Sequence, residues 1–464
     1  MGGADRLAGA RVVVAGARVA GSSAARVLLE RGASVTVTDS SPELLDTLRV
    51  SGIAVAPDLT APPEGTDLIV TSPGWRPDVP LLLAARRAGI DVVGDVELAW
   101  WLDQVRPDGP ADWLVVTGTN GKTTTVGMLE SMLRTAGLDA MACGNVGLPV
   151  LDAVRAGHSV LAVELSSFQL HWSSSLAPRA AAVLNVSADH LDWHGSMTAY
   201  AAAKGTVYAA GTGTAVINAD DEWSVRLAES GAAHRSVEFT LGPPEPGMLG
   251  VARDSLVDRA FGPDSAGVVL APIVDVAPPG PHNVSNALAA AALARSVGVP
   301  AMAVDAGLRS FTPGGHRSIP VGEHRGVRYV DDSKATNPHA ARAALLAHQR
   351  VIWVAGGLLK GADVDELVAG TVDRMAGAVL LGADRAVIAD ALARHAPDLP
   401  VRVVDSGHDG AMKEVVAAAA DLARAGDVVL LAPAAASMDM FTDYAQRGRS
   451  FAAAVVALTG EPGR

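Results

Sequence analysis

Short apolar runs alternate with helix-like segments along most of this chain, and this alternation restricts the fold more than any other feature. Apolar runs at residues 11–16, 34–38 and 67–71 are separated by helix-like segments at 21–31 and 42–50, and another helix is expected at 78–88. Strands that alternate with helices form parallel sheets whose faces the helices cover. The sequence therefore predicts an α/β fold.

The same alternation recurs in two further blocks. Strands are expected at 113–117, 159–163, 180–186 and 214–217, and again at 327–331, 350–355, 377–382, 401–404 and 427–432. A polar stretch rich in proline and glycine at 104–112 is typical of a linker. Residues 230–280 predict short strands and loops, and 283–297 an amphipathic helix. We expect three α/β domains at 1–104, 105–313 and 314–464.

Composition and charge exclude several classes of protein. The 464 residues carry a formal net charge of −13, which repels nucleic acid and anionic membranes. No apolar run is long enough to span a membrane, and residues 1–16 lack the pattern of a signal peptide. Cys143 is the single cysteine, so no internal disulfide can form. A reducing compartment, the cytoplasm, is expected.

A glycine-containing loop follows the apolar run at 113–117. Val115 to Thr123 joins a predicted strand to a predicted helix. Glycines allow backbone N–H groups to surround phosphate oxygens, Lys122 adds a positive charge, and Thr123 can bind Mg²⁺. The strict phosphate-loop pattern requires glycine where Val116 stands, so this loop is a shortened variant. A plain turn before a helix is the alternative, but the Gly-Lys-Thr triplet favours a nucleotide site.

Two more polar groups follow predicted strands. Glu164 ends the apolar run at 160–163, and His190 follows the run at 180–186. The carboxyl ends of parallel strands face the ligand crevice, so both side chains are expected near the phosphate loop. Glu164 suits Mg²⁺, which prefers oxygen ligands. A lone histidine is more often structural, and by context alone His190 stays open between the two roles.

Lysine is rare in this chain. Of 37 cationic residues only five are lysine: Lys122, Lys204, Lys334, Lys360 and Lys413. Lys204 lies in an alanine-rich helical stretch, where a solvated surface lysine is the ordinary interpretation. A buried lysine is the alternative, because burial lowers the pKa of the amine and a neutral amine can capture CO₂ as a carbamate. Lys413 is expected on the surface of a helix.

Four motifs resemble the Mur ligase superfamily, in order and across essentially the whole chain. They span residues 118–124, 144–147, 164–170 and 331–337. The resemblance implies a Rossmann-like N-terminal domain, a central P-loop-type ATPase domain with a parallel sheet, and a Rossmann-like C-terminal domain. It also implies an ATP-dependent amide ligase of peptidoglycan biosynthesis. By this resemblance the enzyme adds D-glutamate to UDP-N-acetylmuramoyl-L-alanine through an acyl-phosphate and acts as a monomer.

The resemblance also implies roles for particular residues. ATP would contact Gly118, Thr119, Asn120, Gly121, Lys122, Thr123, Thr124, Asn283, Arg317 and Asp332. Two Mg²⁺ ions would be held by Thr123, Glu164, His190 and a carbamylated Lys204. The UDP substrate would contact Asp39, Ser40, Ser72, Gly74 and Asn145. The amino acid would contact Thr336, Lys360, Ser437 and Tyr444, with Lys334 near the transferred phosphate. For Asn283, a plain helix cap is the alternative.

The sequence departs from the superfamily at three places, and three other functions compete. The first loop, 16–21, lacks the middle glycine, Ile319 stands where an acid is common, and Tyr444 stands where phenylalanine is usual.

A folylpolyglutamate synthetase is disfavoured by the motifs at 164–170 and 332–337. A regulatory nucleotide hydrolase would not need a third α/β domain. A nicotinamide-dependent oxidoreductase is disfavoured by the missing glycine.

Overall fold

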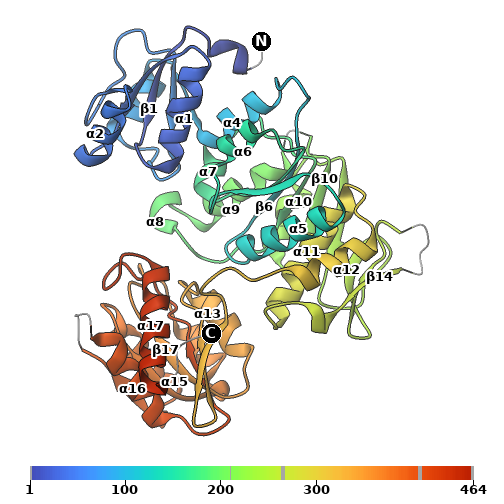
Figure 1. Cartoon of the computed structure of the whole chain (residues 1–464), viewed down its shortest axis with the longest axis vertical. Helices are drawn as coiled ribbons and strands as arrows, with labels where there is room; N and C mark the ends of the chain where they lie inside the picture. Colours follow the sequence, from blue (N-terminus) through green and yellow to red (C-terminus); the bar gives the residue numbers. More distant parts are fainter. Residues whose placement is uncertain (1–2, 210, 263–266, 406–409, 461–464) are drawn as a thin grey trace. The chain divides into compact units, whose positions relative to one another are not determined.

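Three separate sheets organise the chain. The computed structural model describes residues 3–209, 211–262, 267–405 and 410–460. Strands in these ranges form sheets of five, nine and six strands, and helices alternate with them along the chain (Figure 1). The predicted α/β fold is confirmed. No helix among the described residues is both long and apolar enough to cross a membrane.

The first sheet is entirely parallel and has the strand order β3-β2-β1-β4-β5. Its strands are β1 (Arg11–Ala15), β2 (Ser34–Thr38), β3 (Ala54–Val55), β4 (Leu68–Thr71) and β5 (Asp91–Gly94), with helices α1 (Val19–Glu30), α2 (Pro42–Val50), α3 (Pro80–Arg87) and α4 (Asp95–Asp103). The strand order reverses between β1 and β4. Ligands of such sheets bind outside the carboxyl ends of the strands at this point.

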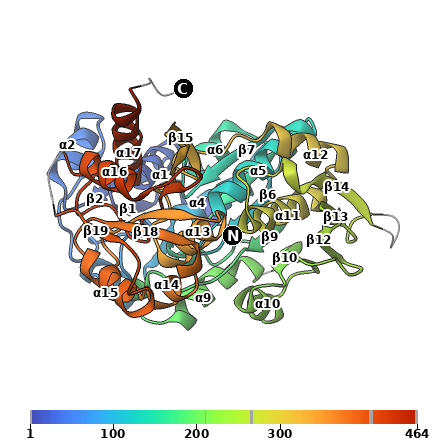
Figure 2. The ribbon, with the colours of Figure 1, turned by 90° about the horizontal axis from the view of Figure 1, so that it is seen from below.

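The second sheet places β6 (Asp112–Thr117) between β8 (Val160–Glu164) and β9 (Ala180–Val183). Its other strands are β7 (Ala140–Gly144), β10 (Thr214–Asn218), β11 (Arg235–Phe239), β12 (Met248–Ala252), β13 (Ser255–Asp258) and β14 (Val268–Pro272). Strands β12 to β14 pair antiparallel and lie at the far edge of the sheet (Figure 2). They occupy the region where short strands and loops were predicted.

The helices of this region are α5 (Lys122–Thr135), α6 (Val150–Ala156), α7 (Ser167–His171), α8 (Leu191–His194), α9 (Met197–Gly205), α10 (Glu222–Glu229), α11 (Pro281–Ser296) and α12 (Ala301–Ser310). The helix predicted at 283–297 exists as α11, but the prediction that it is amphipathic was wrong. Residues 287–294 are all fully buried. Six of these eight residues are alanine, whose small side chain lets neighbouring elements pack around the whole helix.

The third sheet has the order β15-β16-β20-β17-β18-β19. Its strands are β15 (Ile319–His324), β16 (Val327–Asp331), β17 (Val351–Ala355), β18 (Met375–Leu380), β19 (Val401–Val403) and β20 (Val428–Leu431), with helices α13 (Pro338–Leu346), α14 (Asp365–Ala369), α15 (Arg385–His395), α16 (Ala411–Leu422) and α17 (Tyr444–Thr459). Only β15 pairs antiparallel. Separate apolar clusters cover the two faces of this sheet.

The chain forms two compact units. One contains Met1–Val186, His190–Asp275 and Ser285–Phe311, and the other contains Ser187–Asp189, Val276–Val284 and Thr312–Arg464. Within the first unit a continuous apolar cluster extends from the first sheet into the second. Glu97 joins them as well, because its buried carboxylate accepts hydrogen bonds from the backbone N–H groups of Ser174 and Ser175. The boundaries of the three domains expected from the sequence stay a prediction.

Candidate active site

The predicted phosphate loop lies at the carboxyl end of the central strand β6. Gly118 and Gly121 have φ values of 151° and 86°, which side chains rarely adopt, so glycine is needed at both positions. Helix α5 begins at Lys122, and Thr123 and Thr124 lie in its first turn. The Lys122 Nζ donates to the carbonyl oxygens of Gly118 and Thr119, each at 2.9 Å. The Lys122 ammonium is therefore bound by carbonyl oxygens of the loop itself.

Asn185, which was not predicted, fixes this loop from the end of β9. Its Oδ1 accepts the backbone N–H of Asn120 at 2.9 Å, and its Nδ2 donates to the Asn120 carbonyl at 3.2 Å. Its backbone carbonyl accepts the N–H of Thr119 at 2.9 Å. The sequence signal was a polar residue inside the apolar run 180–186, at the strand end that faces the loop.

Glu164 is the last residue of β8 and is buried. Its Oε1 accepts a hydrogen bond from the Nδ2 of Asn145 at 2.9 Å. Gly144 allows this approach, because a Cβ at that position would lie 2.1 Å from the Glu164 carbonyl oxygen. A predicted metal ligand and a predicted substrate contact are thus in direct contact.

Lys204 is 1% exposed, so the solvated surface lysine is wrong for this residue. Its Nζ donates to the Gly118 carbonyl at 2.8 Å and lies 4.5 Å from the centre of the Tyr200 ring. The Tyr200 hydroxyl is 3.0 Å from Thr119 Oγ1. Helix α9 therefore brings a buried amine directly against the phosphate loop.

His190 precedes α8 in a left-handed backbone conformation, with φ of 53°. Its ring centre lies 4.7 Å from that of Phe168. Nearby, His194 Nε2 is 2.9 Å from Ser167 Oγ. Burial, with smaller contributions from His171 and Lys204, lowers the pKa of His194 to about 4. Phe168 thus packs against the predicted metal ligand, and the low pKa of His194 leaves that nearby imidazole neutral at pH 7.

The chemistry of the donors suits magnesium. Among the described residues no group of three or more His, Cys, Asp or Glu side chains could hold a metal ion. Mg²⁺ usually takes one or two protein ligands and completes its shell with water and substrate phosphates. A carboxylate at Glu164 and a hydroxyl at Thr123, both beside a phosphate loop, match that requirement. The ammonium form of Lys204 does not.

In the first sheet the predicted UDP-site residues lie in the loops after β2 and β4. Asp39 holds the first loop, because its Oδ2 accepts the N–H of Ala17 at 2.8 Å. Gly16 packs on Ser72, whose Oγ would lie 2.3 Å from a Cβ at Gly16. The buried Ser72 hydroxyl has no hydrogen-bond partner in the described structure. Gly74 and Ser40 lie in the same two loops as Ser72 and Asp39.

In the third sheet the predicted amino-acid contacts follow β16, β17 and β20. Lys334 and Thr336 come after β16, Lys360 after β17 and Ser437 after β20. Two backbone hydrogen bonds of 2.8 and 2.9 Å between Leu358 and Ala436 join the last two loops. Tyr444 begins α17, and the Lys334 Nζ lies 4.0 Å from its ring centre.

The residues predicted to contact adenosine belong to the compact unit that contains the third sheet. Burial raises the pKa of the Asp332 carboxyl to about 7, and Arg317 partly opposes this. The Nδ1 of His316 is 2.6 Å from Asp331 Oδ2. Asn283 lies two residues inside α11 and is buried, so the helix-cap alternative is wrong.

Comparisons with known proteins agree on one family. The model of the Mur ligase middle domain matches residues 116–294, and that of the Mur ligase glutamate ligase domain matches 316–435. A protein of Thermobifida fusca named UDP-N-acetylmuramoylalanine--D-glutamate ligase is 56% identical, covering 98% of this chain and 100% of that protein. The chain belongs to the Mur ligase family. The Mycobacterium tuberculosis protein of the same name is 49% identical over 97% of this Mur ligase and 96% of its own length.

Solved structures support the same fold at low identity. A UDP-N-acetylmuramate-alanine ligase from Thermotoga maritima has a TM-score of 0.57 and 20% identity, covering 97% of this Mur ligase and 99% of that chain. MurF from Acinetobacter baumannii has a TM-score of 0.57 and 18% identity, covering 90% and 89%. This Mur ligase therefore has the α/β fold of its family, with three sheets.

The structure brings together some predicted residues and adds others. Lys122, Glu164, Asn145 and Lys204 gather at the carboxyl ends of the second sheet. Besides Asn185, sequence reasoning missed Tyr200 and Asn286, and a Cβ at Gly121 would lie 2.3 Å from the Oδ1 of Asn286. It also missed Arg447 in α17. A buried arginine on a helix carries no sequence signal that separates it from a surface arginine.

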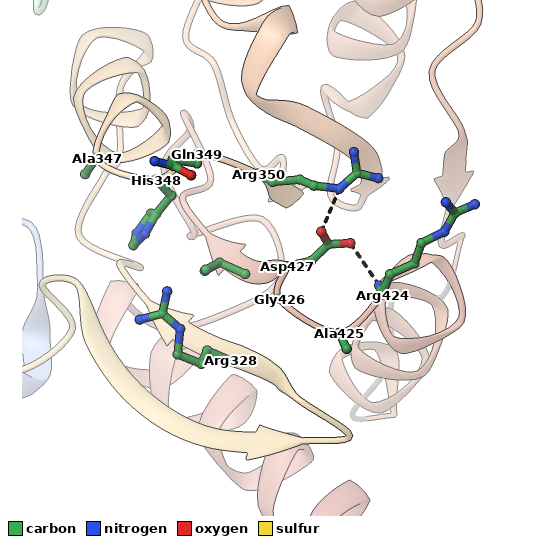
Figure 3. A pocket seen from close by; sticks show the side chains of 10 residues that line it. Arg328, Ala347, His348, Gln349, Arg350, Arg424, Ala425, Gly426 and Asp427 are labelled. Carbon is green, nitrogen blue, oxygen red and sulfur yellow. Dashed lines mark hydrogen bonds and ion pairs between the residues drawn. The ribbon is translucent and has the colours of Figure 1, made fainter.

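A cavity at the opposite strand ends of the third sheet lies outside this site. Its volume is about 560 Å³, and the strands β16, β17 and β20 begin there (Figure 3). Asp427 is one of the residues that line it. One Asp427 oxygen accepts from Arg350 Nε at 2.7 Å and the other from the N–H of Arg424 at 2.8 Å. Since this carboxylate is already satisfied within the protein, we assign the cavity no part in the reaction.

Proposed function

We propose that this Mur ligase adds D-glutamate to UDP-N-acetylmuramoyl-L-alanine, using ATP, in peptidoglycan biosynthesis. One observation carries the proposal: relatives that bear the name of this ligase are 49 to 56% identical over 97 to 99% of the chain. The site geometry supports it, because a phosphate loop, a buried carboxylate and a third sheet with two lysines are the parts that such a reaction needs.

In the proposed reaction the substrate carboxylate attacks the γ-phosphate of ATP, and the amine of D-glutamate then displaces phosphate from the acyl-phosphate. Lys122 exchanges its loop carbonyls for phosphate oxygens, and the α5 N-terminus adds partial positive charge. Lys334 meets the transferred phosphate. Mg²⁺, which Thr123, Glu164 and His190 would hold, supplies further charge stabilisation. Exclusion of water protects the acyl-phosphate from hydrolysis.

Carbamylation of Lys204 is part of this proposal. The amine is buried against the Gly118 carbonyl, where the ammonium form is costly. Addition of CO₂ to the neutral amine releases a proton and leaves an anionic oxygen pair. That pair reverses the charge at this position and provides hard ligands for a second Mg²⁺.

Substrate binding is proposed at the other two sheets and the adenine side. The UDP group meets Asp39, Ser40, Ser72 and Gly74, and the orphaned Ser72 hydroxyl offers it a hydrogen bond. Adenosine meets Asn283, Arg317 and Asp332, and D-glutamate meets Thr336, Lys360, Ser437 and Tyr444. We further propose that the enzyme is a cytoplasmic monomer, since cytosol supplies its nucleotides and its one cysteine is buried and unpaired.

One assay tests the function directly. Phosphate release from ATP is measured with UDP-N-acetylmuramoyl-L-alanine and a panel of acceptors: D-glutamate, L-glutamate, meso-diaminopimelate, L-lysine and L-alanine. A parallel reaction offers a folate with L-glutamate. We expect turnover with D-glutamate and with none of the other acceptors. Turnover with another acceptor, or with the folate, and none with D-glutamate would refute the proposal.

A further inference from the structure

The guanidinium of Arg447 is the most deeply buried cation of the third-sheet region. Its side chain, on the first turn of α17, is 1% exposed. The Nε donates to Ser333 Oγ at 3.0 Å, the Nη2 to the Ser333 carbonyl at 2.9 Å, and the Nη1 to the Ala435 carbonyl at 3.0 Å. A longer contact of 3.4 Å joins the Nη1 to the Gly356 carbonyl.

These acceptors belong to three different loops of the candidate site. Ser333 directly precedes Lys334, Gly356 opens the loop that leads to Lys360, and Ala435 lies two residues before Ser437. One planar group therefore contacts every loop to which an amino-acid contact is assigned. The fork of a guanidinium fixes its acceptors in angle as well as distance, which a lysine ammonium does not.

If this position only stabilised the fold, an apolar side chain could fill it without the free-energy cost of burying a charge. No ion pair within 4 Å joins Arg447 to a carboxylate in the described ranges, so its charge is satisfied by neutral oxygens. Burial lowers the pKa of Arg447 to about 10, which leaves it charged at neutral pH, while Asp439 and Asp331 partly offset the penalty. Burial of a charge costs free energy unless the charge is paired and hydrogen-bonded, and here only the hydrogen bonds are present.

The loops would also keep their fold without this side chain. Leu358 and Ala436 are joined by two backbone hydrogen bonds, and the N–H of Ala434 donates to the Ala335 carbonyl at 3.0 Å. Removal of Arg447 should thus change the spacing of the loops rather than unfold them. Misplacement by about 1 Å can lower the rate of an enzyme by about 100-fold.

We propose that Arg447 is a positioning residue for the amino-acid substrate: its guanidinium sets the spacing of the loops that carry Lys334 and Thr336, Lys360, and Ser437. This inference rests on the proposed function of those loops. It gives α17 a part in positioning the acceptor loops, in addition to the contact assigned to Tyr444.

The test compares R447M, R447K and the unchanged enzyme by steady-state kinetics for each of the three substrates. R447M should raise the KM for D-glutamate by about 10-fold or more and leave the KM for the UDP-sugar, whose assigned contacts lie outside the third sheet, within about two-fold. R447K should regain part of any lost melting temperature but not the KM for D-glutamate, because it restores the charge without the planar fork.

Trp353→Phe is the matched control. Trp353 is fully buried in the same sheet, and its Nε1 donates to the Ala432 carbonyl at 2.8 Å, so W353F also removes one buried bond to a carbonyl after β20. At an equal loss of melting temperature it should not change the KM for D-glutamate.

Two results would overturn the inference: a parallel rise of all three KM values in R447K, or an unchanged KM for D-glutamate in either variant. If R447M does not fold, R447K decides alone. Failure of the unchanged enzyme to use D-glutamate would instead contradict the proposed function, and the comparison would then be made with the acceptor that it does use.

Discussion

Lys204 would carry a positive charge as an ammonium and a negative charge as a carbamate, and substitutions at this residue distinguish the two. Lys204→Ala should abolish most ligase activity, by about 10³-fold or more if it removes a ligand that stabilises charge in the transition state. Acetate should restore part of the activity of this variant by supplying a carboxylate. Lys204→Arg should be as inactive as the alanine variant, because a guanidinium retains the charge and cannot be carbamylated. Phosphate release under saturating substrates is the measurement.

Lys413 provides the control for this series, since it is exposed on α16 and its replacement by alanine should leave activity unchanged. For the unmutated enzyme, depletion of CO₂ should lower activity and bicarbonate should restore it. Full activity of the arginine variant would show that the amine is not modified during turnover.

Asp95, the first residue of α4, gives the protein a predictable pH dependence. It is 4% exposed, and burial raises the pKa of its carboxyl to about 6. The unfolded chain releases this proton near pH 4, while the folded chain keeps it to about pH 6. Stability from this group is therefore greatest below pH 4 and is lost as pH rises through that window, by roughly 2 to 3 kcal/mol.

The measurement is urea unfolding of the unchanged protein and of Asp95→Asn between pH 4.5 and 7.5. Asparagine does not titrate, so the difference in unfolding free energy between the two proteins isolates this group. The unchanged protein should lose stability relative to the variant as pH rises. A constant difference, or one of opposite sign, would contradict the assignment.

Among the elements, the end of β9 should control nucleotide binding through Asn185. Asn185→Ala removes both side-chain hydrogen bonds to Asn120 and leaves the backbone bond to Thr119. We expect the KM for ATP to rise about 10-fold, since two such bonds contribute roughly 1 to 3 kcal/mol. The KM for D-glutamate should stay constant. Asn218→Ala is the control, because the Asn218 side chain donates to the carbonyl oxygen of Leu184, the residue before Asn185, and has no hydrogen bond to the loop.

Elements were predictable from the sequence where a local pattern decides them. The loop at 118–124 and the buried strands around it follow from apolar runs, glycines and one lysine. Strand β7 was missed because Ala140–Gly144 is short and rich in small residues, and β15 because it is half exposed and contains Pro320. Asn120 lies 65 residues from Asn185, and Ser333 lies 114 residues from Arg447. No local sequence pattern indicates contacts of such long range.

Lys204 shows the same limit for the site. Its alanine-rich surroundings fit a surface helix and a buried helix equally well, and only the packing of α9 against the phosphate loop separates them. The family resemblance supplied what spacing could not, because it carries tertiary contacts that related chains share. The roles proposed for Arg317 and Asp332 come from that resemblance.

At the scale of the whole molecule, strand order determines when each sheet can be completed during synthesis. The first sheet uses only residues 11–94, so all its strands have been translated before the second sheet has begun. In the third sheet β20 lies between β16 and β17, which precede it by about 70 residues or more. Those two strands have no direct pairing with each other. During synthesis, the edges of β16 and β17 that pair with β20 stay without a neighbouring strand until Val428–Leu431 has been translated. Unpaired strand edges are sites at which incompletely synthesised chains aggregate.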